Sequence, residues 1–101
     1  MNLGHAIKMC RTRRGLLQAE LAERADCSMS YLSVLENNKR DPTLSTLTKI
    51  SDALNIPIGL LFFLASDKDE LQGMDKDLAG ELARTALELL SEPADKQSAA
   101  L

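Results

Sequence analysis

The fold of this chain is decided by residues 18–42, which read QAELAERADCSMSYLSVLENNKRDP. Apolar residues recur at helical spacing in residues 18–25 and again in residues 29–37, so both segments are predicted to be short helices. Only residues 26–28 separate them, which leaves room for a tight turn. The last of these, Ser28, is a good helix cap because its hydroxyl can accept a hydrogen bond from a free amide of the next turn. The stretch therefore predicts two helices that cross at a steep angle.

Such a turn presents the N-terminal end of the second helix outward. That end carries free amides and the positive end of the helix dipole, both of which suit an approach to phosphates. Serine and asparagine can exchange hydrogen bonds with base edges, and methionine and valine can pack on a thymine methyl. Lys39 and Arg40 follow the helix at the height where the flanking DNA backbone would pass. The residues expected to face the bases are Met29, Ser30, Ser33, Val34 and Asn37.

Further helices are expected before and after this pair. A first helix, with Leu3, Ile7 and Cys10 in its buried stripe, ends near Gly15. Thr43 caps a fourth helix whose apolar residues fit a repeat of about 3.6 residues. The fifth and sixth helices are expected over residues 58–65 and about 75–90. The predicted organisation is a helix-turn-helix domain over 1–65, a linker over 66–74, a C-terminal helical segment over 75–92 and a disordered tail over 93–101.

The composition favours an all-α fold, and the helical spacing along the chain predicts five helices in the first domain and a sixth after it. Apolar residues make up 45% of the 101 residues and aromatic residues only 3%, whereas sandwiches and barrels are rich in aromatic side chains. No apolar stretch reaches the roughly 18 residues needed to cross a membrane, and no signal peptide is recognisable. Cys10 and Cys27 are isolated, so they are expected to fill the core of a cytoplasmic protein rather than to form a disulfide framework or a redox switch.

The charge is distributed unevenly along the chain, although the formal net charge is only −3. Seven basic and four acidic residues lie before Asp41, which gives that part a net charge of +3. From Asp41 onward, five basic residues face eleven acidic ones, a net charge of −6. One end of the molecule is therefore expected to face phosphates while the other repels them.

This pattern resembles the phage-repressor and Cro type of helix-turn-helix regulator, often called the XRE-like family. The similarity runs from about Leu3 to Leu64. It is carried by Gln18, Leu21-Ala22, Ser28, Leu32-Ser33, Leu35-Glu36, Lys39, Pro42, Leu47 and Ala53-Leu54. The resemblance implies that the third helix enters the major groove of double-stranded DNA while the second crosses the backbone. It also implies a two-fold dimer on a pseudo-palindrome, with half-sites roughly 34 Å apart.

The resemblance further implies roles for single residues. Gln18 takes the position that contacts a phosphate and braces the reading helix, and Tyr31 lies near the backbone. Arg11 and Glu36 take positions that the family often pairs for a structural purpose. Arg14 is added on its charge and place alone, with solvated surface as the alternative. The residues predicted to contact phosphate are Gln18, Ser28, Tyr31, Lys39, Arg40 and Arg14.

Three positions depart from the family pattern. Leu17 replaces the usual serine or threonine cap of the second helix. Asn38 replaces a glycine, which asparagine can do at some cost to the backbone. Val34 stands where a basic or polar residue is common. The reading face thus lacks an arginine for guanine, so thymine methyls, DNA shape and phosphates are expected to contribute instead.

The last two helices carry more apolar residues than each could bury against the core of a single chain. The favoured interpretation is a homodimer, and the alternative is that the sixth helix folds back on the first and fifth helices of its own chain. The residues predicted at the dimer interface are Leu60, Phe62, Phe63, Leu78, Leu82 and Leu89.

The sequence therefore predicts a homodimeric, operator-binding repressor of phage, plasmid or mobile-element type. The alternatives are an antitoxin or adaptor that binds a partner protein through the last two helices, and a restriction-modification controller. A toxin or an antirepressor is a possible protein partner. No enzymatic activity, cofactor or metal is expected, because the single histidine, His5, has no acid or nucleophile near it in sequence.

Overall fold

The computed structural model describes residues 1–91 of the chain, which form six helices and no strand. They are α1 (Leu3–Arg13), α2 (Gln18–Arg24), α3 (Met29–Glu36), α4 (Leu44–Leu54), α5 (Ile58–Ala65) and α6 (Lys76–Ser91). The all-α prediction is confirmed, and the expected helix boundaries are met to within about two residues. The predicted tail over 93–101 and the last residue of the segment 75–92 lie outside the described residues.

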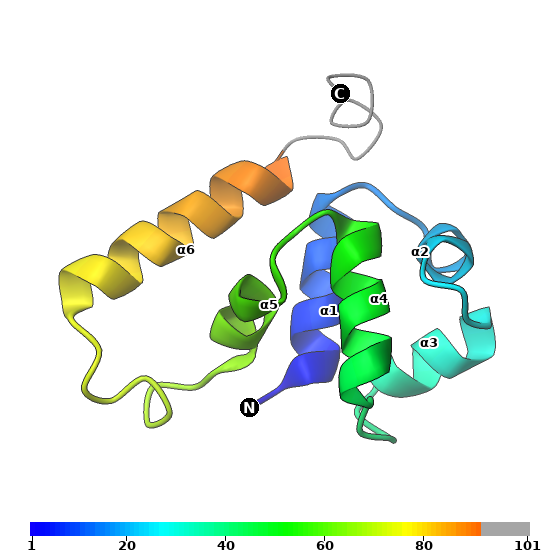
Figure 1. Ribbon diagram of the computed structural model, residues 1–101, viewed down its shortest axis with the longest axis horizontal. Coiled ribbons are helices and arrows are strands. Elements are labelled where there is room, and N and C mark those ends of the chain that lie inside the picture. Colours follow the sequence, from blue (N-terminus) through cyan, green and yellow to red (C-terminus); the bar gives the residue numbers. More distant parts are fainter. Residues whose placement is uncertain (92–101) are drawn as a thin grey trace.

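The helices are arranged around α1, which packs against α3 on one side and α5 on the other. In Figure 1 the pair α2 and α3 lies at one end of the molecule and α6 at the opposite end, with α1, α4 and α5 between them. Helices α4 and α5 meet at an angle of 103°. Taken together they have the length and composition of a broken membrane span, but no single helix in the described chain is long and apolar enough to cross a membrane.

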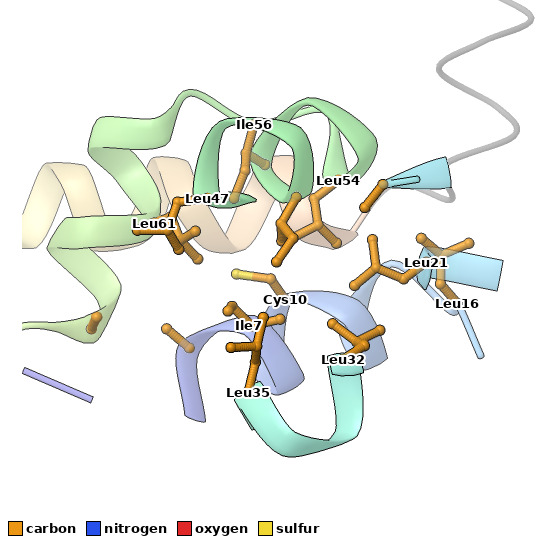
Figure 2. Close-up of a cluster of buried hydrophobic side chains, with 14 of the residues drawn as sticks. Ile7, Cys10, Leu16, Leu21, Leu32, Leu35, Leu47, Leu54, Ile56 and Leu61 are labelled. Atoms are coloured by element: carbon orange, nitrogen blue, oxygen red, sulfur yellow. The ribbon is translucent and has the colours of Figure 1, made fainter. Parts of the chain in front are cut away.

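A single hydrophobic cluster holds α1 to α5 together. Figure 2 shows aliphatic side chains from α1, α3, α4 and α5 converging on one another, with the Cys10 sulfur among them. Cys10 is completely buried, and this burial raises the pKa of its thiol to about 11. The interpretation of Cys10 as a core residue is therefore confirmed.

The helix ends follow the local hydrogen-bonding rules. The Ser28 hydroxyl accepts from the Tyr31 amide at 3.0 Å, and the Thr43 hydroxyl accepts from the Thr46 amide at 3.1 Å. Both caps confirm the sequence prediction. Asn38 adopts the left-handed conformation, with φ of 57°, which lets the chain leave α3 sharply.

Helix α6 folds back on α1 and α5 of its own chain. This is the alternative to the interpretation favoured from the sequence, which was packing across a homodimer. Ala86 and Leu90 are completely buried in this contact. Leu78 and Leu87 stay exposed on other faces of the helix. The homodimer stays a prediction, and its interface would have to use the solvent-exposed faces of α6.

The start of α1 lies against the end of α3, and the contact requires Gly4. The Asn38 side chain accepts a hydrogen bond from the Gly4 amide at 3.1 Å and donates one to the Asn2 side chain at 2.8 Å. A Cβ at Gly4 would collide with the Leu35 carbonyl oxygen and the Asn38 amide oxygen. Only glycine therefore lets the two helices approach this closely.

Replacing Gly4 with alanine is expected to lower the free energy of unfolding by about 2 kcal/mol, the usual cost of overpacking a tight contact. Gly80→Ala is the matched control, because Gly80 lies inside α6 with open space around its Cα. That change should stabilise the protein by up to about 1 kcal/mol through helix propensity. Chemical denaturation followed by circular dichroism measures both. Equal effects of the two substitutions would contradict the close approach at Gly4.

Candidate nucleic-acid interface

The turn between α2 and α3 consists of Ala25 to Ser28 and depends on a left-handed residue. Asp26 has φ of 56°, a conformation that aspartate tolerates better than most residues. Cys27 follows it and is half-buried, and burial is the main cause that raises the pKa of its thiol. This thiol is therefore less reactive than a free one, which disfavours a redox role. The described residues contain no cluster of histidine, cysteine or acidic side chains that could hold a metal.

The outward face of α3 carries the residues that were predicted to face bases. Met29 is 52% exposed at the first position of the helix. Ser30 and Asn37 are also exposed, while Ser33, Val34 and Tyr31 are half-buried. The exposure agrees with a reading face, and contact of these residues with DNA stays a prediction.

The loop after α3 carries Lys39 and Arg40, both exposed. The Lys39 amide donates to the Val34 carbonyl at 3.0 Å, which ties the start of this loop to the end of the helix. Because Asn38 turns the chain just before Lys39, the two basic side chains leave from the end of α3 rather than from its outward face. The charge is thus placed directly after the helix that carries the reading face.

A buried ion pair holds α3 to α1. The Arg11 guanidinium donates to both carboxylate oxygens of Glu36, at 2.8 and 3.0 Å. It also donates to the Leu16 carbonyl at 2.9 Å, just before α2. The Gln18 side chain donates to the same Glu36 carboxylate at 3.2 Å. The structural pairing of Arg11 with Glu36 and the bracing role of Gln18 are therefore confirmed, whereas a phosphate contact of Gln18 stays a prediction.

The prediction that Arg14 contacts phosphate is wrong, because this residue is only 2% exposed. Its guanidinium donates to the carbonyls of Leu54 and Asn55 at the end of α4, at 2.9 and 3.0 Å. It also donates to the Leu89 carbonyl in α6 at 2.6 Å. Arg14, at the end of α1, is thus hydrogen-bonded to the end of α4 and to α6 inside the molecule. The sequence did show an arginine beside a predicted helix end. It could not show which carbonyls this arginine binds, because they lie at least 40 residues further along the chain.

The burial of Arg11 and Arg14 changes the electrostatic prediction for the first part of the chain. Arg11 is neutralised by Glu36, and Arg14 is enclosed. The exposed basic side chains before Asp41 are Lys8, Arg13, Arg24, Lys39 and Arg40, and the exposed acidic ones are Glu20, Glu23 and Asp26. The basic excess at the surface is therefore modest.

The expectation that α2 lacks a side-chain cap is confirmed. Leu17 makes no capping hydrogen bond and lies exposed. Its backbone amide donates to the Glu20 carboxylate at 2.8 Å, which satisfies one donor at this helix start. That donor is therefore satisfied within the chain. The exposed Leu17 side chain presents an apolar surface at the position where the family usually has a hydroxyl.

Comparison with known proteins agrees with this geometry. Residues 7–61 match the helix-turn-helix family model HTH_3. The immunity repressor protein of Bacillus phage phi105 is 41% identical over 61 residues, which are 60% of this chain and 42% of the phage protein. The transcriptional regulator ImmR of Bacillus subtilis is 31% identical over 93 residues, 91% of this chain and 70% of ImmR. The ImmF control region 10 kDa protein of the same phage is 34% identical over 85 residues, 84% of this chain and 93% of that protein. The likeness to ImmR therefore extends beyond residue 61 and includes α6.

Replacing Glu36 with alanine is expected to lower the free energy of unfolding by about 3 kcal/mol or more, because it leaves the Arg11 charge buried without its partner. Glu23→Ala, at an exposed position of α2, is the matched control and should change stability by less than about 0.5 kcal/mol. The double variant Arg11→Met, Glu36→Leu should be more stable than Glu36→Leu alone, since an apolar pair carries no desolvation penalty. The role assigned to the ion pair fails if Glu36→Ala costs no more than Glu23→Ala.

Proposed function

This chain belongs to the helix-turn-helix family HTH_3, and from that premise we propose that it is a phage-type transcriptional repressor that binds a pseudo-palindromic operator as a homodimer. The proposal places the protein in the cytoplasm with its DNA and assigns it no catalytic activity. The phage phi105 relative is named a repressor and ImmR a transcriptional regulator, and the proposal extends these two roles to this chain. The chain spans only 42% of that phage repressor, so functions of the remainder of that protein are not carried over.

The observation that carries the proposal is the combination of an exposed α3 face with an adjacent basic loop. Met29, Ser30 and Asn37 face water, and Lys39 and Arg40 leave from the end of the same helix. A helix of this kind fits the DNA major groove, and lysine and arginine beside it can bind the flanking phosphates. Helix α6, with three acidic and two basic residues, lies at the opposite end of the molecule, where its net negative charge would not repel the DNA (Figure 1).

Exposed apolar side chains near the C-terminal end of the described chain support the homodimer. Leu78 is 49% exposed and Leu87 is also exposed, although both are large aliphatic residues on a helix with much polar surface. The half-buried residues predicted for the same interface are Leu60, Phe62, Phe63, Leu82 and Leu89. A second copy of the chain would bury these groups and place two reading helices on one operator. A partner protein, as in an antitoxin or adaptor, is the competing occupant.

The proposal predicts that the protein selects a duplex from a random-sequence pool and that Lys39→Gln with Arg40→Gln weakens its binding to every duplex. Each lost phosphate contact should reduce the slope of log affinity against log salt by about 0.9, so the pair should reduce it by about 2 per protomer. Lys68→Gln with Lys76→Gln removes the same charge from the other end of the molecule and is the matched control. Fluorescence anisotropy at several salt concentrations measures the slope.

Replacing Ser30, Ser33 and Asn37 together with alanine should instead lower the preference for the selected duplex over a random one by about tenfold or more. If the loop variant and its control behave alike, Lys39 and Arg40 do not contact DNA. If no duplex is selected at all, the repressor proposal fails.

The dimer predicts that Leu78→Lys shifts the protein from dimer to monomer at micromolar concentration, because a charge then replaces a buried aliphatic group. Leu44→Lys is the matched control, since Leu44 is also exposed, at 67%, but is the first residue of α4 rather than part of α6. Sedimentation equilibrium of the purified protein measures the mass. If the wild-type protein is a monomer both in the absence of DNA and when bound to its selected duplex, the partner-protein alternative is favoured.

A further inference from the structure

The outward face of α3 carries no charge. The helix contains a single charged residue, Glu36, and that carboxylate is buried against Arg11 and Gln18. The side chains that remain on the outside are neutral ones, from methionine, serine and valine. Direct recognition of guanine in the major groove usually uses arginine or lysine on its O6 and N7 atoms. Helix α3 has no side chain of this kind to offer.

The asparagine at the end of this face is turned back on its own helix. The Asn37 side-chain nitrogen donates to the Ser33 carbonyl at 2.8 Å and lies 3.5 Å from the Ser33 hydroxyl. An asparagine reads adenine with its nitrogen and its oxygen together, directed at the N7 and N6 atoms. Because one N–H is already engaged within the helix, Asn37 is poorly placed for this two-point contact.

What remains at the leading end of α3 is an apolar side chain. Met29 is the first residue of the helix, directly after the Ser28 cap, and about half of its surface is exposed. In helix-turn-helix proteins the N-terminal residues of the recognition helix are those that contact base edges. The apolar feature of the major groove is the C5-methyl group of thymine. A flexible thioether is well suited to pack on such a group.

We infer that Met29 selects the base at the position it contacts by packing against the thymine C5-methyl group, so that the half-site carries thymine there, where an arginine-led helix would select guanine. The inference rests on the proposed function and names the class of operator. It has a chemical consequence, because 5-methylcytosine presents the same methyl group at the same place. A cytosine methylated at that position should bind better than an unmethylated one.

The test uses the duplex that the wild-type protein selects from a random-sequence pool. Deoxyuridine replaces thymine at the positions contacted near the start of α3, which removes only the methyl groups. Each methyl lost should weaken binding about fourfold, the fold-change that corresponds to burying one methylene group. Met29→Ala should weaken binding to the thymine duplex to a similar extent and cause little further loss on the deoxyuridine duplex. Leu44→Ala, which truncates an exposed aliphatic residue at the first position of α4, is the control and should have the same effect on both duplexes.

The outcomes separate the inference from the function beneath it. Selection of a duplex whose affinity is unaffected by deoxyuridine, or equal losses from Met29→Ala on both duplexes, overturns the role of Met29 while leaving the repressor proposal intact. Failure to select any duplex overturns both. Met29→Gln keeps the length of the side chain and should reproduce the effect of Met29→Ala on thymine, with a thermal melt confirming that each variant is folded.

Discussion

The Arg11 guanidinium meets the Glu36 carboxylate through two hydrogen bonds at a place where water reaches neither group freely. Removing two charges from water is costly, and the cost is recovered only when their geometry is close to ideal. The pair therefore tolerates little change in the angle between α1 and α3. Gln18 and the Leu16 carbonyl join the same network, so the start of α2 is held as well. The orientation of α3, on which any DNA contact depends, follows from this constraint.

The same network explains why the surface of α3 is neutral. The only carboxylate of the helix is used inside the molecule, and so is the arginine that faces it. The positive charge that remains nearby comes from Lys39 and Arg40, which the left-handed Asn38 directs away from the end of the helix. Structural support, base contact and phosphate contact are thus assigned to different side chains. A substitution in one of these three sets of side chains should therefore change stability, sequence preference or the salt dependence of binding, and leave the other two properties nearly unchanged.

The sequence predicted well those features that depend on neighbouring residues. The Ser28 and Thr43 caps and the turn at Asn38 each involve groups at most a few residues apart, so local rules suffice. The ion pair of Arg11 and Glu36 was expected only through the family resemblance, because nothing in a separation of 25 residues points to it. The error at Arg14 has the same origin, since its acceptors lie 40, 41 and 75 residues away.

The position of α6 could not be predicted from its apolar pattern, because a broad apolar face can be covered by the same chain or by another. The buried Leu90 and the hydrogen bond from Arg14 to the Leu89 carbonyl decide for the same chain. This attachment has a consequence for the proposed dimer. Since α6 is fixed to α1 and α4 through Arg14, and α1 is fixed to α3 through Glu36, two chains that pair through the exposed side of α6 would hold their reading helices at a fixed separation. The spacing of the operator half-sites would then be set by buried polar contacts rather than by the linker before α6.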